Sequence, residues 1–185
     1  MQYNPDLHHR RSIRLKGYDY SSPGAYFITI CTRDRICWFG EVVEGEMRLN
    51  QLGQRVRSVW QTLPHHFPGL TLDEFIVMPN HMRGILVLND TSRRGEAFAS
   101  QPISQSHRID ANASPLPPCG TQPGSIAAIV QNFKSVSTRK INQICQTPGT
   151  PIWQRNYYEH IIRNENALQN IRQYITSNPA SWKQD

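Results

Sequence analysis

The chain has 185 residues, with 20 Lys+Arg against 14 Asp+Glu and a formal net charge of +6. This length predicts one domain over residues 1–185, and a hydrophobic fraction of 38% is enough to build a core. No segment reaches membrane-spanning length and the first residues lack a signal-peptide apolar stretch, so we expect a cytoplasmic protein without membrane contact. The positive charge favours an anionic partner without identifying it.

Strand signals dominate the first third of the chain. Residues 24–33 are rich in aromatic and β-branched side chains and predict a strand. Residues 36–50 predict a hairpin that turns at Glu44-Gly45. Residues 51–63 place their apolar side chains at helical spacing, which predicts an amphipathic helix.

Two further strands are expected on either side of a Pro-Asn turn. They cover residues 70–78 and 83–88 and predict an antiparallel pair. Because side chains alternate along a strand, His81 and Arg83 would point to the same face. Two histidines at this spacing would make half of a metal site, but here the second position is arginine.

The composition changes after the second strand of this pair. Residues 89–123 are rich in Ser, Gln, Asn, Ala and Pro without periodicity, and predict a flexible insertion. Residues 124–144 then predict an amphipathic helix, with Lys134, Arg139 and Lys140 outside its apolar stripe. Those cations form either a solvated face or a face that follows phosphates, and the pattern leaves both open.

The last predicted helix covers residues 164–178, with Asn164 as N-cap and Pro179 beyond its end. Tyr174 and Asn178 are one helical turn apart and therefore share a face. A phenol can attack phosphorus when a cation neutralises the phosphate, although most helical tyrosines only pack.

Strand-rich and helix-rich segments alternate without regular βαβ units. This indicates an α+β fold, with a central antiparallel sheet of four to five strands and helices mainly on one face.

Four segments carry a resemblance to a known family. They are "RLKGYDYSSPGAYFITICTRDR", "LDEFIVMPNHMRGILVLND", "GSIAAIVQNFKS", and "IWQRNYYEHIIRN" through "IRQYITSNPASW". In this order they resemble the REP-associated tyrosine transposases, which belong to the single-tyrosine HUH-type insertion-sequence transposases. The resemblance runs from about residue 11 to 182, with 89–123 unmatched.

The resemblance implies both a fold and an activity. The fold would be ferredoxin-like, as in HUH-type transposases. The activity would be that of a single-stranded DNA endonuclease and strand transferase of a mobile element, which cleaves next to a hairpin. Cleavage would pass through a 5′-phosphotyrosine intermediate, with Mg²⁺ or Mn²⁺ as cofactor.

The resemblance also assigns roles to three residues and leaves a fourth position unmatched. Tyr174 falls at the position of the nucleophile, and Asn178 at that of a polar metal ligand. His81 matches the first metal-binding histidine of the HUH motif, whereas Arg83 stands where the second is expected. Arginine stays protonated near neutral pH, so it cannot ligate a metal and would repel one.

Arg83 leaves three hypotheses open. The protein is a catalytically inactive hairpin-binding derivative of such a transposase, or Arg83 binds the scissile phosphate in place of the metal. Alternatively, His81 and Asn178 hold a weakened metal site together with His160 or Glu159. A remoter alternative is an RNA-binding protein, which the lack of an RNP-type aromatic pattern disfavours.

The remaining candidates are charged or aromatic side chains expected at a DNA surface. They are Arg10, Arg11, Arg14, Lys16, Lys134, Arg139, Lys140, Arg155, Tyr157, Tyr158, Glu159 and His160. The basic groups would contact phosphates, and the two tyrosines would stack on unpaired bases or pack in the core. The sequence specifies neither the hairpin nor whether the protein is a monomer or a homodimer.

Overall fold

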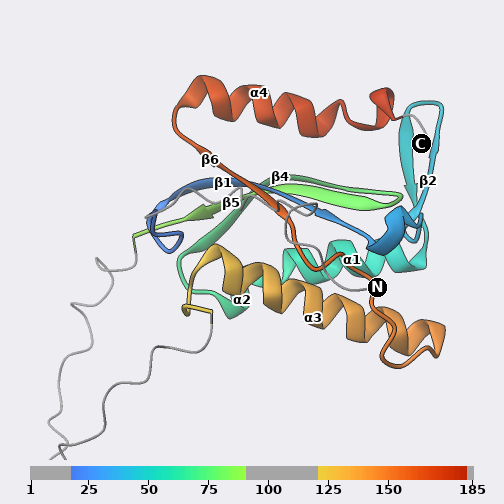
Figure 1. Ribbon diagram of the computed structural model, residues 1–185. Coiled ribbons are helices and arrows are strands. Elements are labelled where there is room, and N and C mark those ends of the chain that lie inside the picture. Colours follow the sequence, from blue (N-terminus) through green and yellow to red (C-terminus); the bar gives the residue numbers. More distant parts are fainter. Residues whose placement is uncertain (1–17, 91–120, 183–185) are drawn as a thin grey trace, which may run out of the picture.

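The computed structural model describes residues 18–90 and 121–182. Its centre is a four-stranded antiparallel sheet with the strand order β4-β5-β1-β6 (Figure 1). The sheet strands are β1 (Gly24–Cys31), β4 (Leu70–Met78), β5 (His81–Leu88) and β6 (Tyr158–Ile162). A separate hairpin consists of β2 (Gly40–Val43) and β3 (Glu46–Leu49). The helices are α1 (Gln51–Gln61), α2 (Leu63–His66), α3 (Ile126–Cys145) and α4 (Glu165–Thr176), and the 3₁₀ turns are η1 (Arg33–Arg35) and η3 (Pro179–Ser181).

The α+β prediction is confirmed, with local differences. The β2–β3 hairpin turns at Glu44 and Gly45, which have φ angles of 54° and 79°. Positive φ at both central residues is what a two-residue hairpin turn of this kind requires. β5 begins at His81, two residues earlier than expected. β6 pairs with the edge of β1 and completes the sheet, and it was not predicted as a strand.

The two faces of the sheet bury different cores. α1 and α3 cover one face, where a large core includes Trp60 of α1 and Phe133 of α3 (Figure 1). α4 lies across the opposite face over a small cluster. The buried members of this small cluster are Phe27, Ile85, Ile162 and Ile175. The helices are thus mainly on one face, and α4 lies alone on the other.

The strand register decides which side chains face α4. Arg83 of β5 pairs with Thr29 of β1, and Ile85 pairs with Phe27. Ile85 belongs to the cluster under α4, whereas Met82 belongs to the large core. Since side chains alternate, His81, Arg83 and Ile85 share the α4 face, as the sequence predicted for the first two.

Some expectations lie outside the described residues. These are the N-terminal candidates Arg10, Arg11, Arg14 and Lys16, and most of the expected insertion, residues 91–120. At the described start of that insertion, the Asn89 side chain donates hydrogen bonds to the Gly69 carbonyl and the Thr71 hydroxyl. No helix within the described ranges is long and apolar enough to cross a membrane.

Candidate functional site

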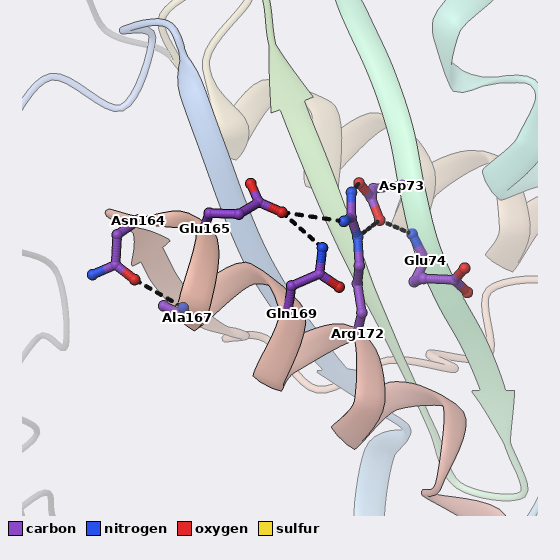
Figure 2. Close-up of polar contacts among 7 residues, drawn as sticks. All are labelled: Asp73, Glu74, Asn164, Glu165, Ala167, Gln169 and Arg172. Carbon is purple, nitrogen blue, oxygen red and sulfur yellow. Dashed lines mark hydrogen bonds and ion pairs between the residues drawn. The ribbon is translucent and has the colours of Figure 1, made fainter.

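α4 is fixed on the sheet by an ion pair close to Tyr174. The Arg172 guanidinium donates two hydrogen bonds to the Asp73 carboxylate on β4, one of them 2.9 Å long between Nε and Oδ1 (Figure 2). Glu165 lies on the other side of the guanidinium, with its Oε1 3.7 Å from Nη1. The Arg172 hydrogen bond holds the pKa of Asp73 below its usual range. This contact attaches α4 to β4 two residues before Tyr174.

Tyr174 lies at the boundary between the small core and solvent. Its ring packs edge-on against Phe27, with 6.2 Å between centroids, and the residue is 46% exposed. Packing therefore orients the ring, while nearly half of the residue remains accessible to a ligand.

Arg83 lies against the ring of Tyr174. Its Cζ atom is 4.5 Å from the ring centroid. Its Nε and Nη1 atoms are buried and have no hydrogen-bond partner, and no described carboxylate forms an ion pair with it. Burial lowers the pKa of the guanidinium, and the charge of Arg35 acts in the same direction. Arginine nevertheless stays protonated in proteins, so the site contains an uncompensated, half-buried positive charge.

His81 is buried beside Arg83 and presents a free ring nitrogen. Its Nδ1 lies 2.9 Å from Asn80 Oδ1, a contact in which Nδ1 donates when it carries the ring proton. Its Nε2 is buried without a hydrogen-bond partner, as is Asn178 Oδ1. Burial, with the charge of Arg83, lowers the pKa of His81 to about 4, although Asn178 acts in the opposite direction. The ring is therefore neutral near pH 7.

These residues do not make a complete site for Mg²⁺ or Mn²⁺. His81 Nε2 and Asn178 Oδ1 are two unpartnered atoms of the kind that bind a cation. The third expected position is occupied by the Arg83 guanidinium, which has no lone pair to offer and would repel the ion. The described ranges contain no group of three or more His, Cys, Asp or Glu side chains able to hold a metal. The side chains of this site thus fit an anion better than a divalent cation.

The register of β6 contradicts the hypothesis that Glu159 or His160 completes a weakened metal site. Glu159 pairs with Ile28, whose side chain lies in the large core, so Glu159 points away from the α4 face. His160 is on the α4 face but pairs with Phe27, four residues along β1 from the partner of His81. Four residues of strand span roughly 13 Å, which is beyond the reach of a shared ligand.

Lys134, a predicted DNA contact, is used within the protein. Its Nζ donates hydrogen bonds to the carbonyl oxygens of Gln154, Arg155 and Asn156, at 3.0, 3.2 and 3.1 Å. The same ammonium lies 5.3 Å from the centroid of the Tyr157 ring. These contacts attach the segment before β6 to α3, so they give Lys134 and Tyr157 a structural role.

The other predicted DNA contacts fall on two sides of the sheet. Tyr158 is on the α4 face, 43% exposed, and packs edge-on against Phe27 at 6.2 Å, as Tyr174 does. Arg139 and Lys140 belong to α3, which lies across the sheet from α4 (Figure 1). Tyr158 is therefore the candidate that the fold brings to the nucleophile, and contact with DNA stays a prediction for all of them.

Sequence reasoning missed two residues of the site. Arg35 has a positive φ of 57° in η1, and its charge reaches both His81 and Arg83. Trp182 packs over His81, with 5.7 Å between ring centroids. Only the position of Trp182, shortly after Asn178 in a matched segment, offered a signal.

Comparison with known proteins agrees with this architecture. Residues 121–178 match the family described as "Transposase IS200 like". A protein of Haemophilus influenzae (strain ATCC 51907 / DSM 11121 / KW20 / Rd), named only as an uncharacterized protein, is 42% identical over 187 residues, which cover 100% of this chain and 96% of that protein. The solved structure of a REP-associated tyrosine transposase bound to a REP hairpin aligns with a TM-score of 0.54 at 17% identity, over 92% of this chain and 73% of that one. At this identity, the structural likeness shows a shared fold.

Proposed function

The chain belongs to the IS200-like transposase family, and from this premise we propose that it binds single-stranded DNA beside a hairpin and cleaves and rejoins the strand through Tyr174. One observation carries the proposal: a half-exposed tyrosine is oriented by packing directly beside an unpaired guanidinium. The structural neighbour with a bound REP hairpin supports a hairpin as the substrate class.

The proposed reaction is a transfer of a phosphodiester from a sugar to the tyrosine and back. Tyr174 Oη attacks the phosphorus, the bond from phosphorus to the 3′ oxygen breaks, and the fragment downstream of the break stays attached to the tyrosine through its 5′ phosphate. The phenol loses one proton and the released 3′ oxygen gains one, so no external reactant is consumed. Attack by a 3′-hydroxyl on the phosphotyrosine reverses the step and rejoins DNA.

The chain's own groups orient this chemistry. Arg172 and Asp73 fix the helix that carries the nucleophile, and Phe27 supports its ring. Positioning of this kind lowers the entropic part of the barrier for an in-line attack.

A hairpin-binding protein without cleavage is the second candidate. The presence of Arg83 at the second position of the HUH motif favours it, because the residues supply only two of the expected metal ligands. Both candidates require binding of hairpin DNA, and they differ in whether a covalent adduct forms.

A denaturing-gel assay distinguishes the two. The probe is a labelled pool of hairpin oligonucleotides with randomised single-stranded flanks, incubated with or without Mn²⁺. We expect the wild-type protein to form an adduct and Tyr174→Phe to form none. Tyr158→Phe removes a nearby phenol but keeps the ring that would stack on a base, so it should still form the adduct. An adduct formed only by Arg83→His, or hairpin binding without an adduct from any variant, would support the non-cleaving candidate.

A further inference from the structure

We propose that the Arg83 guanidinium is the cationic ligand of the DNA phosphate facing Tyr174, so that this site binds its phosphate without a divalent metal ion. The inference rests on the proposed function in one respect only, namely the identity of the phosphate as that of the DNA strand. On this inference the site binds an anion, at the position where the resemblance implied a metal cation.

The hydrogen-bonding state of Arg83 points to a missing anionic partner. A guanidinium carries five N–H donors, and here Nε and Nη1 are buried with no acceptor. Burying an unpaired charge is unfavourable, and charge-assisted hydrogen bonds to phosphate oxygens would remove that cost.

Nearby carboxylates do not supply the missing partner. Asp73 is the acidic residue that anchors α4, and both of its carboxylate oxygens already accept hydrogen bonds from Arg172. Glu159 points to the opposite face of the sheet. The positive charge of Arg83 therefore remains available to a ligand.

The surroundings of Arg83 fit a phosphate on a nucleic acid. Its contact with the Tyr174 ring holds the guanidinium beside the attacking group. The charge of Arg35 reaches the same place and adds to the positive potential. His81, which is buried and packed under Trp182, lines the adjacent part of the site. An anion would thus meet two cations, and neither Asp73 nor Glu159 would oppose it.

The first test measures Mn²⁺ alone, without DNA. Free Mn²⁺ is followed by electron paramagnetic resonance during titration of the wild-type protein, Arg83→His and the double variant Arg83→His, His81→Ala. We expect Arg83→His to bind Mn²⁺ at least tenfold more tightly than the wild type, and the double variant to lose this gain. Wild-type protein that binds Mn²⁺ as tightly as Arg83→His, with the affinity lost in the double variant, would overturn the proposal.

The second test measures DNA binding by fluorescence anisotropy with the hairpin pool used for the adduct assay. In EDTA we expect Arg83→Met to weaken binding about tenfold or more, since charge-assisted hydrogen bonds are lost. Arg83→Lys should recover part of the affinity. Arg57→Met, which removes an exposed charge on α1 across the sheet, is the matched control and should change affinity less than about threefold.

The outcomes separate this inference from the proposed function. Wild-type binding that is equal in EDTA and Mn²⁺ and depends on Arg83 supports the inference, whether or not an adduct forms. Binding that requires Mn²⁺, or an Arg83→Met affinity equal to that of Arg57→Met, overturns it even if Tyr174 forms an adduct. Should Arg83→Met fail to fold, the comparison of wild type with Arg83→Lys and the Mn²⁺ titration still decide.

Discussion

Arg83 is a residue at which stability and ligand binding oppose each other. Its charge is half-buried without an ionic partner, so the free protein carries a desolvation cost that an apolar side chain of similar length would avoid. We expect Arg83→Met to raise the free energy of unfolding by about 1 kcal/mol, as measured by urea denaturation at pH 7. Arg57→Met should stay within about 0.5 kcal/mol of wild type. A loss of stability in Arg83→Met would show that the guanidinium stabilises the free protein.

At single residues, the sequence predicted part of the geometry of the candidate site. The shared face of His81 and Arg83 follows from strand alternation, and that of Tyr174 and Asn178 from helical spacing. The contact between Arg83 and Tyr174 could not be predicted, because it joins β5 to α4 and depends on how that helix packs on the sheet.

The placement of α4 depends on its ion pair with β4. Asp73 has a pKa below its ordinary 3.8, first because of the hydrogen bond from Arg172, so folding favours its ionised form. We expect Asp73→Asn to lower the free energy of unfolding by about 1 kcal/mol at pH 7, because the pair is partly exposed. This difference is fully present above pH 3.8 and is lost as the pH falls through the lower pKa of the folded state.

Urea denaturation of wild type and Asp73→Asn across that pH range checks the prediction. Glu41→Gln, which neutralises an exposed carboxylate on the separate β2–β3 hairpin, is the control and should change stability little. A pH-independent difference between wild type and Asp73→Asn would show that the ion pair is not its cause.

At the level of elements, the sequence predicted those helices and strands that are bounded by a turn or a capping residue. The Glu44-Gly45 turn set the β2–β3 hairpin, and the Asn164 side chain caps α4 by accepting a 2.8 Å hydrogen bond from the Ala167 amide. β6 was not predicted, because five residues at a sheet edge alternate too briefly to be recognised as a strand. Its register determines the face of the sheet on which Glu159 and His160 lie, and depends on pairing with β1, which is distant in the sequence.

In the whole molecule, the candidate nucleophile Tyr174 lies on the face of the sheet that has the smaller core. α1 and α3 share a large core on one face of the sheet, whereas α4 rests on the small cluster around Phe27 and on the Asp73–Arg172 pair. Less buried apolar surface means a smaller free energy for detaching the element. The position of α4, and with it that of Tyr174, therefore depends strongly on the Asp73–Arg172 pair.

Native-state hydrogen exchange tests this asymmetry. We expect α4 amides to exchange by local opening, at a free energy at least about 2 kcal/mol below that of α3 and β5, which open only with global unfolding. Ile175→Ala, at a fully buried position under α4, should lower the opening free energy of α4 further while leaving α3 protected. Ile141→Ala, buried in the large core, should instead lower the protection of the whole domain. Equal protection of α4 and β5 in the wild type would mean that the sheet and both helical layers open as one unit, and that the nucleophile is held as rigidly as the core.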